Sequence, residues 1–144
     1  MSKTAIANID ENDLDHWRQM FLDFANLHDV TPTPEGVART WGWLCDPRHP
    51  ETGLMVRIGD KVVGFVHYRL QPSALRGTQI LYLDDLFVTE THRGSGVADD
   101  IIGPPTRDCT RTLLQRHPLG HPCHQRTRPS VLRTPCQKHQ LDYV

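Results

Sequence analysis

The sequence predicts a mixed α/β fold with a mostly antiparallel central sheet and flanking helices. Three observations predict it: helical patterns follow a short strand pattern near the N-terminus, two β-rich runs flank a tight-turn sequence, and a third apolar run ends in a glycine loop. With 144 residues, 38% of them hydrophobic and 23% charged, the chain has the size and composition of one globular domain.

The first third of the chain predicts a strand and two helices. Residues 5–9 form the strand, and residues 10–13 supply a cap and first-turn acids for the first helix. The apolar positions of that helix are three or four residues apart, at Leu14, Trp17, Phe21, Phe24 and Leu27. Thr33 then caps a second helix that has Pro34 at its first position.

The next segment predicts three strands. Residues 53–58 and 62–70 flank Gly59-Asp60-Lys61, which indicates a hairpin with a tight turn. Residues 79–88 follow, and both of their alternating sets are apolar, as in a central strand. Two adjacent aspartates in the middle of this run break the apolar pattern, so they are the first candidate functional residues.

Asp84 and Asp85 indicate a cleft. Adjacent carboxylates are poor strand formers, and at least one must face an otherwise apolar side, where an unpaired charge is costly. A cleft at this point would give them a solvated role in proton transfer. The alternative is that the strand opens to solvent there, or that one aspartate pairs with Arg57 or Arg69.

Residues 89–102 predict an anion-binding loop. Gly94 and Gly96 let the backbone turn tightly with its amides inward, and the start of the next helix adds a positive dipole end. This arrangement suits a phosphate or pyrophosphate, although it matches neither the Walker loop nor the dinucleotide fingerprint. Asp99 and Asp100 would repel a phosphate, so we expect them to point away from the loop.

The loop and the strand before it carry a family resemblance. Arg93, Gly96 and Ala98 fill the pattern Arg/Gln-x-x-Gly-x-Gly/Ala directly after a strand. In this the sequence resembles the GNAT superfamily of acyl-CoA-dependent N-acetyltransferases, in which that signature follows the fourth strand. The resemblance covers about residues 4–102.

The resemblance implies acetyl-CoA as the co-substrate and no metal. Backbone groups at the strand end would pair with the pantetheine arm and loop amides would hold the pyrophosphate; these cofactor-binding residues are Leu86, Phe87, Val88, Arg93, Gly94, Ser95, Gly96, Val97 and Ala98. A primary amine, the acceptor, must lose a proton before its lone pair can attack the thioester. Asp85 or Asp84 is the candidate base and His67 the second candidate, with a structural role as its alternative.

The implied function is acetyl transfer to a small cationic amine, and a non-catalytic CoA-binding module is the alternative. A net charge of -1 gives no whole-chain case for nucleic-acid or membrane binding. No apolar run approaches the roughly 20 residues that span a bilayer, and residues 1–5 lack the apolar stretch of an export signal. We therefore expect a cytoplasmic protein with reduced cysteines, while a homodimer stays open.

Residues 103–144 depart from the family. Residues 1–102 hold 9 basic and 15 acidic residues, whereas residues 103–144 hold 7 basic and 2 acidic residues and six of the eleven prolines. Prolines at this density forbid a long helix, and the family's next strand, its helix opening with Asn and its Tyr are missing. If the possible codons of this segment are read one base later, they can encode the missing strand, the helix that opens with Asn and the Tyr. We therefore expect a frame shift near Gly103 and an aberrant tail that is not natively folded.

Two alternatives give this tail a function. A zinc site could use Cys123, His124, Cys136 and His139, but their order fits no strong template. A nucleic-acid-binding tail would have Tyr143 as its only aromatic residue for stacking on bases.

Overall fold

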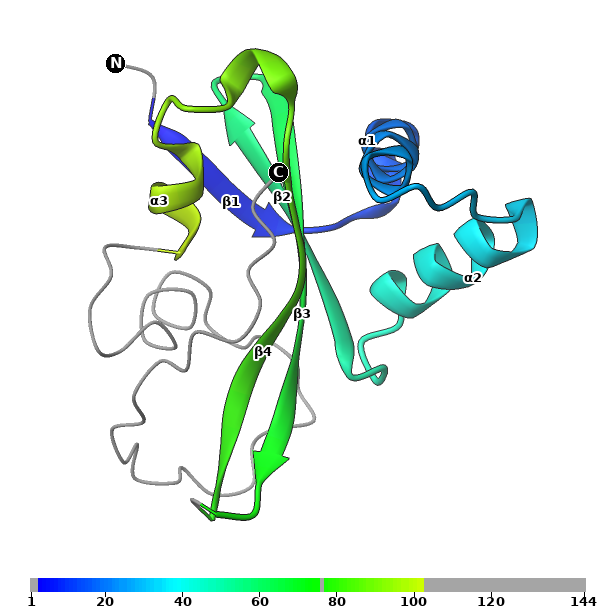
Figure 1. Ribbon diagram of the computed structural model, residues 1–144, viewed down its shortest axis with the longest axis vertical. Coiled ribbons are helices and arrows are strands. Elements are labelled where there is room, and N and C mark those ends of the chain that lie inside the picture. The colour runs from blue at the N-terminus through cyan, green and yellow to red at the C-terminus, as the bar shows by residue number, and fades with distance from the viewer. Residues whose placement is uncertain (1–2, 76, 103–144) are drawn as a thin grey trace.

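The protein is a four-stranded antiparallel sheet with helices on both faces, as the computed structural model shows for residues 3–75 and 77–102 (Figure 1). The strands, which lie in the sheet in chain order, are β1 (Thr4–Asn8), β2 (Glu51–Ile58), β3 (Lys61–Ser73) and β4 (Thr78–Val88). The predicted fold class is confirmed. One detail differs: β4, which its apolar pattern placed in the centre, is an edge strand of the described sheet.

Capping residues precede both long helices. The Asp10 side chain accepts a hydrogen bond from the backbone N–H of Asn12 at 2.7 Å and caps the short 3₁₀ helix that leads into the first long helix. Thr33 caps the second long helix directly by accepting a hydrogen bond from Gly36 at 3.1 Å. The helical segments are η1 (Glu11–Asp13), α1 (Leu14–Leu27), α2 (Pro34–Cys45), η2 (Glu90–His92) and α3 (Val97–Ile102). Helices α1 and α2 cover one face of the sheet, and α3 lies on the other (Figure 1).

The sheet is buried on both faces, which explains why its strands are apolar at successive positions. On the α3 face the buried residues include Leu54, Val56, Val66, Val88, Val97 and Ile101. On the face of α1 and α2 they include Trp17, Met20, Leu44, Met55, Phe65 and Phe87. Neighbours such as Phe65 and Val66 therefore belong to opposite layers, as strand alternation requires.

Several expectations fall on residues 103–144, outside the described residues. They concern the aberrant tail, the frame shift and the metal ligands Cys123, His124, Cys136 and His139, and they stay predictions. Of the four cysteines only Cys45 is described, and it forms no disulfide. No helix within residues 3–75 and 77–102 is long and apolar enough to cross a membrane.

Candidate active site

A β-bulge in β4 places Asp84 and Asp85 on the same face of the sheet. The ladder pairs His67 with Asp85 but the next residue, Tyr68, with Leu83, so Asp84 is an extra residue on β4. Regular alternation would send the two carboxylates to opposite faces. The bulge cancels that alternation, so both carboxylates, and not one alone, lie on this face.

The partners of the two aspartates confirm this placement. Asp85 Oδ2 lies 2.8 Å from His67 Nδ1, and Asp84 Oδ1 lies 3.1 Å from Arg69 Nη1. His67 and Arg69 are two residues apart on β3, so their side chains share a face. The pairing with Arg69 is one of the alternatives that the sequence left open. Arg57 instead forms an ion pair with Asp13 at the start of α1.

His67 holds Asp85 in place. Its ring is 1% exposed, and the Trp17 indole Nε1–H donates to His67 Nε2 at 3.0 Å. Because Nε2 accepts this bond, the hydrogen-bond network assigns the proton of the neutral imidazole to Nδ1, which donates it to Asp85. Both ring nitrogens are thus occupied. This geometry favours the structural alternative for His67, as a residue that orients a carboxylate.

Glu51 joins this group, although the sequence reasoning missed it. It begins β2 opposite Arg69 in the β2–β3 ladder, and its carboxylate Oε2 lies 3.8 Å from Arg69 Nη1. Burial, followed by the nearby charge of Asp84, raises the pKa of Glu51 to about 7. The hairpin register was the available signal, since extending the predicted pairing outward from the turn brings Glu51 beside Arg69.

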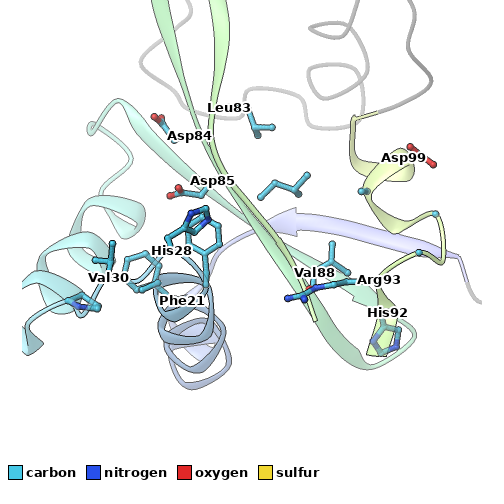
Figure 2. Close-up of a pocket in the computed structure, with 17 residues that line it drawn as sticks. Phe21, His28, Val30, Leu83, Asp84, Asp85, Val88, His92, Arg93 and Asp99 are labelled. Carbon is cyan, nitrogen blue, oxygen red and sulfur yellow. The ribbon is translucent and has the colours of Figure 1, made fainter. Parts of the chain in front are cut away.

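One cleft connects the aspartates to the glycine loop. It has a volume of about 680 Å³ and lies between α1 with the loop that follows it and β4 with the glycine loop (Figure 2). Of the predicted residues, those that line it are Asp84, Asp85, Leu86, Val88, Arg93, Gly94, Gly96 and Ala98. The opposite wall carries residues that the sequence did not assign to a site; they include Phe21, Phe24, His28, Val30 and Pro32.

Four predicted site residues lie outside the lining of this cleft. Phe87 and Val97 are buried in the two apolar layers, and His67 lies buried behind Asp85. Ser95 is exposed and donates its hydroxyl to the carbonyl oxygen of His92 at 2.6 Å. A role for the first two in cofactor binding would therefore use backbone groups, as the resemblance implies.

The glycine loop has the backbone geometry that its glycines predict. Gly94 has φ 72° and Gly96 has φ 85°, both in the left-handed region that glycine adopts at little cost. Arg93 Nε donates to the carbonyl oxygen of Val88 at 3.0 Å, which ties the loop to the end of β4. Asp100 points away, since it accepts a hydrogen bond from Thr4. Asp99 is among the residues that line the cleft, and Figure 2 shows its carboxylate pointing away from Arg93.

This cleft has opposite chemistry at its two ends. Figure 2 shows Asp84 and Asp85 together at one end and Arg93 with His92 toward the other. Between them runs β4, whose second edge has no strand beside it within the described residues. A strand that leads through a glycine loop into a helix is the arrangement that the resemblance to acyl-CoA-dependent acyltransferases implies. A sequence model of the acetyltransferase (GNAT) family matches residues 14–102, and the chain belongs to that family.

Curated and solved relatives include acetyltransferases of several kinds. The chain is 24% identical over 103 residues to the D-amino-acid N-acetyltransferase HPA3 of Saccharomyces cerevisiae, covering 69% of this chain and 63% of that protein. The structure resembles a ribosomal-protein-alanine N-acetyltransferase from Brucella melitensis, with 22% identity, a TM-score of 0.57 and coverage of 69% and 66%. It also resembles an aminoglycoside acetyltransferase from a soil metagenome, with 18% identity, a TM-score of 0.52 and coverage of 69% and 64%. These two similarities show the fold. The chain spans about two thirds of each relative's length.

Proposed function

We propose that this protein transfers the acetyl group of acetyl-CoA to the primary amine of a small cationic molecule. One observation carries the proposal: a single cleft joins a pair of carboxylates to a glycine loop of phosphate-binding type. Family membership supports the reaction class. The donor, the acceptor and the residue roles are our inference from the geometry.

The loop end of the cleft fits the anionic part of acetyl-CoA. Gly94 and Gly96 in left-handed conformations turn the backbone sharply, which can group N–H donors around a phosphate. Arg93 contributes a positive charge beside them. The free edge of β4 offers backbone N–H and C=O groups to the amide-containing pantetheine arm, in the way that an extended peptide adds to a sheet edge.

The carboxylate end of the cleft fits an ammonium group. Asp84 and Asp85 lie in the cleft wall at the bulge, where they attract a cation and can accept its proton. When bound, acetyl-CoA supplies a thioester carbonyl for the deprotonated amine. The protein's own contribution is to hold the amine, remove a proton and exclude water with the aromatic wall of Phe21 and Phe24. The name of the yeast relative, a D-amino-acid N-acetyltransferase, supports a small amine as the acceptor.

Calorimetric titration with acetyl-CoA tests the donor half of this proposal. Gly96→Val places a β-branched residue at a positive φ within the loop, so we expect acetyl-CoA binding to be lost. Among residues 3–75 and 77–102, no atom beyond the chain neighbours lies within 4 Å of an added Cβ there, so the strain comes from the backbone and not from a clash with these residues.

Gly59→Val is the matched control. Gly59 also has a positive φ, 58°, and open space around an added Cβ, but it lies in the β2–β3 turn. The control suffers comparable strain and should keep its affinity for acetyl-CoA. Equal affinity of wild type and Gly96→Val would rule out the loop as the binding site, and binding without amine acetylation would indicate a non-catalytic CoA-binding module.

A further inference from the structure

We propose that Glu51 is a positioning residue for acetyl transfer, which acts through Asp84 by holding the proton that Asp84 takes from the acceptor ammonium. The inference rests on the proposed function, since it adds a residue to the same reaction. Glu51 does not line the cleft, so it acts only through its neighbour. It lies on β2, two strands away from the strand that carries the aspartates.

The position of Glu51 follows from the sheet. Glu51 pairs with Arg69 across β2 and β3, and the bulge in β4 turns Asp84 toward the same arginine. Arg69 is held over the ring of Tyr82, with its guanidinium carbon 4.8 Å from the ring centre. The two carboxyl groups therefore meet around one cation, and three strands fix their geometry.

The unpaired oxygen of Asp84 shows where the pair can hold a proton. Asp84 Oδ2 is buried and has no hydrogen-bond partner within the described part of the chain. Glu51 Oε2 and Asp84 Oδ1 both lie beside Arg69 Nη1, at 3.8 and 3.1 Å, so the two negative charges oppose each other and a proton taken up by the pair relieves that repulsion. By contrast, Asp85 Oδ2 already receives the N–H of His67. Asp84 is thus the carboxylate of the cleft with a second carboxyl to which it can pass a proton.

The titratable and charged groups around Glu51 come from three elements besides its own strand. They are Arg69 on β3, Asp84 and Asp85 on β4, and His49 in the turn before β2, whose Nδ1 accepts the backbone N–H of Glu51. Burial and the two aspartates disfavour a charge on Glu51, whereas Arg69 favours it. The sum raises the pKa of Glu51 to about 7, close to the value that suits proton exchange at neutral pH.

The proton balance of the reaction closes with this pair. The acceptor enters as R–NH₃⁺ and gives one proton to Asp84, which shares it with Glu51. The lone pair of R–NH₂ then forms the C–N bond at the thioester carbonyl, and the C–S bond breaks. The second amine proton leaves with sulfur as the thiol of CoA. The proton on Glu51 returns to solvent, which restores the pair.

Carboxyl-carbon NMR tests the pair in the full chain without acetyl-CoA. The chain has four glutamates, Glu11, Glu35, Glu51 and Glu90, so labelling glutamate carboxyl carbons gives four signals. We expect one to titrate near pH 7 and to disappear in Glu51→Gln. In Asp84→Asn it should titrate at lower pH, because a neutral neighbour no longer opposes the charge. The inference is overturned if no glutamate titrates above about pH 6, or if Asp84→Asn changes nothing.

The pH profile of amine acetylation tests the role of Glu51 in holding the proton. Glutamine in Glu51→Gln keeps a hydrogen-bond donor for Asp84 but cannot take up a proton. We expect kcat to fall by about 100-fold and its ionisation near pH 7 to vanish, with the KM for acetyl-CoA unchanged. A purely structural Glu51 would leave the shape of the profile as in wild type.

Glu35→Gln is the matched control, since Glu35 is exposed at the start of α2, and it should keep the wild-type profile. The two proposals can fail separately. Acetyl-CoA turnover with a wild-type profile in Glu51→Gln overturns only the role of Glu51, whereas absence of acetyl-CoA binding by the wild type overturns the proposed function and this inference with it.

Discussion

At the scale of single residues, the hydrogen-bond partners of His67 decide what it can do. Trp17 donates to one ring nitrogen and Asp85 accepts from the other, so the imidazole is fixed in one tautomer and one orientation. Aromatic rings enclose it; the Phe65 ring centre lies 4.5 Å away and that of Phe21 5.9 Å away. A histidine in this setting serves as a rigid support for the carboxylate that lines the cleft.

The hydrogen bond from Trp17 to His67 predicts the effect of Trp17→Phe. The variant keeps most of the buried ring but removes the N–H, which leaves the buried His67 Nε2 without its donor. We expect a loss of about 1–3 kcal/mol in the free energy of unfolding, measured with urea. Trp43→Phe is the control, because that indole is 42% exposed, and it should change stability by less than about 0.5 kcal/mol. Equal stability of wild type and Trp17→Phe would contradict the proposed support.

Asp85→Asn tests the acceptor end of the cleft. The substitution keeps the size of the side chain but removes a charge that attracts an ammonium group. We expect a drop in kcat/KM for the amine of about 10-fold or more, with the acetyl-CoA affinity unchanged. Asp60→Asn, in the exposed β2–β3 turn, is the control. Equal losses in turnover and in acetyl-CoA affinity would indicate a structural aspartate.

At the scale of elements, β3 and β4 approach each other very closely just beyond the candidate site. Gly64 lies opposite Val88 in the ladder, and a Cβ at this position would overlap the carbonyl oxygen of Phe87. That carbonyl belongs to the strand end that we assign to the pantetheine arm. Glycine is therefore required at position 64 by the packing of one backbone against another.

This contact makes Gly64→Ala a sharp test of the strand pairing. The added methyl group must push β4 away from β3, so we expect a loss of about 1–3 kcal/mol in the free energy of unfolding. Gly42→Ala is the control, because its added Cβ has open space around it in the described part of the chain. Alanine in the middle of α2 should increase stability by up to about 1 kcal/mol. Thermal or urea unfolding of the two variants compares them directly.

At the scale of the whole molecule, the raised pKa of Glu51 couples folding to pH. The folded protein binds the Glu51 proton more tightly than the unfolded chain does, since the pKa rises from 4.5 to about 7 on folding. The stability that this proton contributes is therefore fully present below about pH 4.5 and is lost as the pH rises through about 7. The sign is opposite to that of a carboxylate stabilised in its charged form.

We expect Glu51→Gln to remove this part of the pH dependence. The difference in unfolding free energy between wild type and variant should change steadily between about pH 5 and about pH 8, to the disadvantage of wild type at high pH. Urea unfolding at a series of pH values measures it. A difference that stays constant across this range would show that Glu51 has an ordinary pKa in the folded protein.

The sequence by itself determined those features that depend on neighbours along the chain. The apolar spacing predicts α1 and α2, Asp10 caps the η1 segment that leads into α1, and Thr33 caps α2. The pair Gly94 and Gly96 predicts the tight turns of the loop. The motif of Arg93, Gly96 and Ala98 also indicated the family. Local backbone preference and helix periodicity decide each of these, and both can be read from a few adjacent residues. The frame shift expected near Gly103 stays a prediction that the coding DNA can test.

Only the tertiary structure decided which residues share the candidate site. The bulge at Asp84 depends on the register between β3 and β4, and a shift of one residue turns a side chain to the other face. The hairpin register could place Glu51 beside Arg69, but its contact with Asp84 depends on that same bulge, which lies two strands away. Burial and hydrogen bonding between distant segments set the tautomer of His67 and the pKa of Glu51, and no local pattern encodes them.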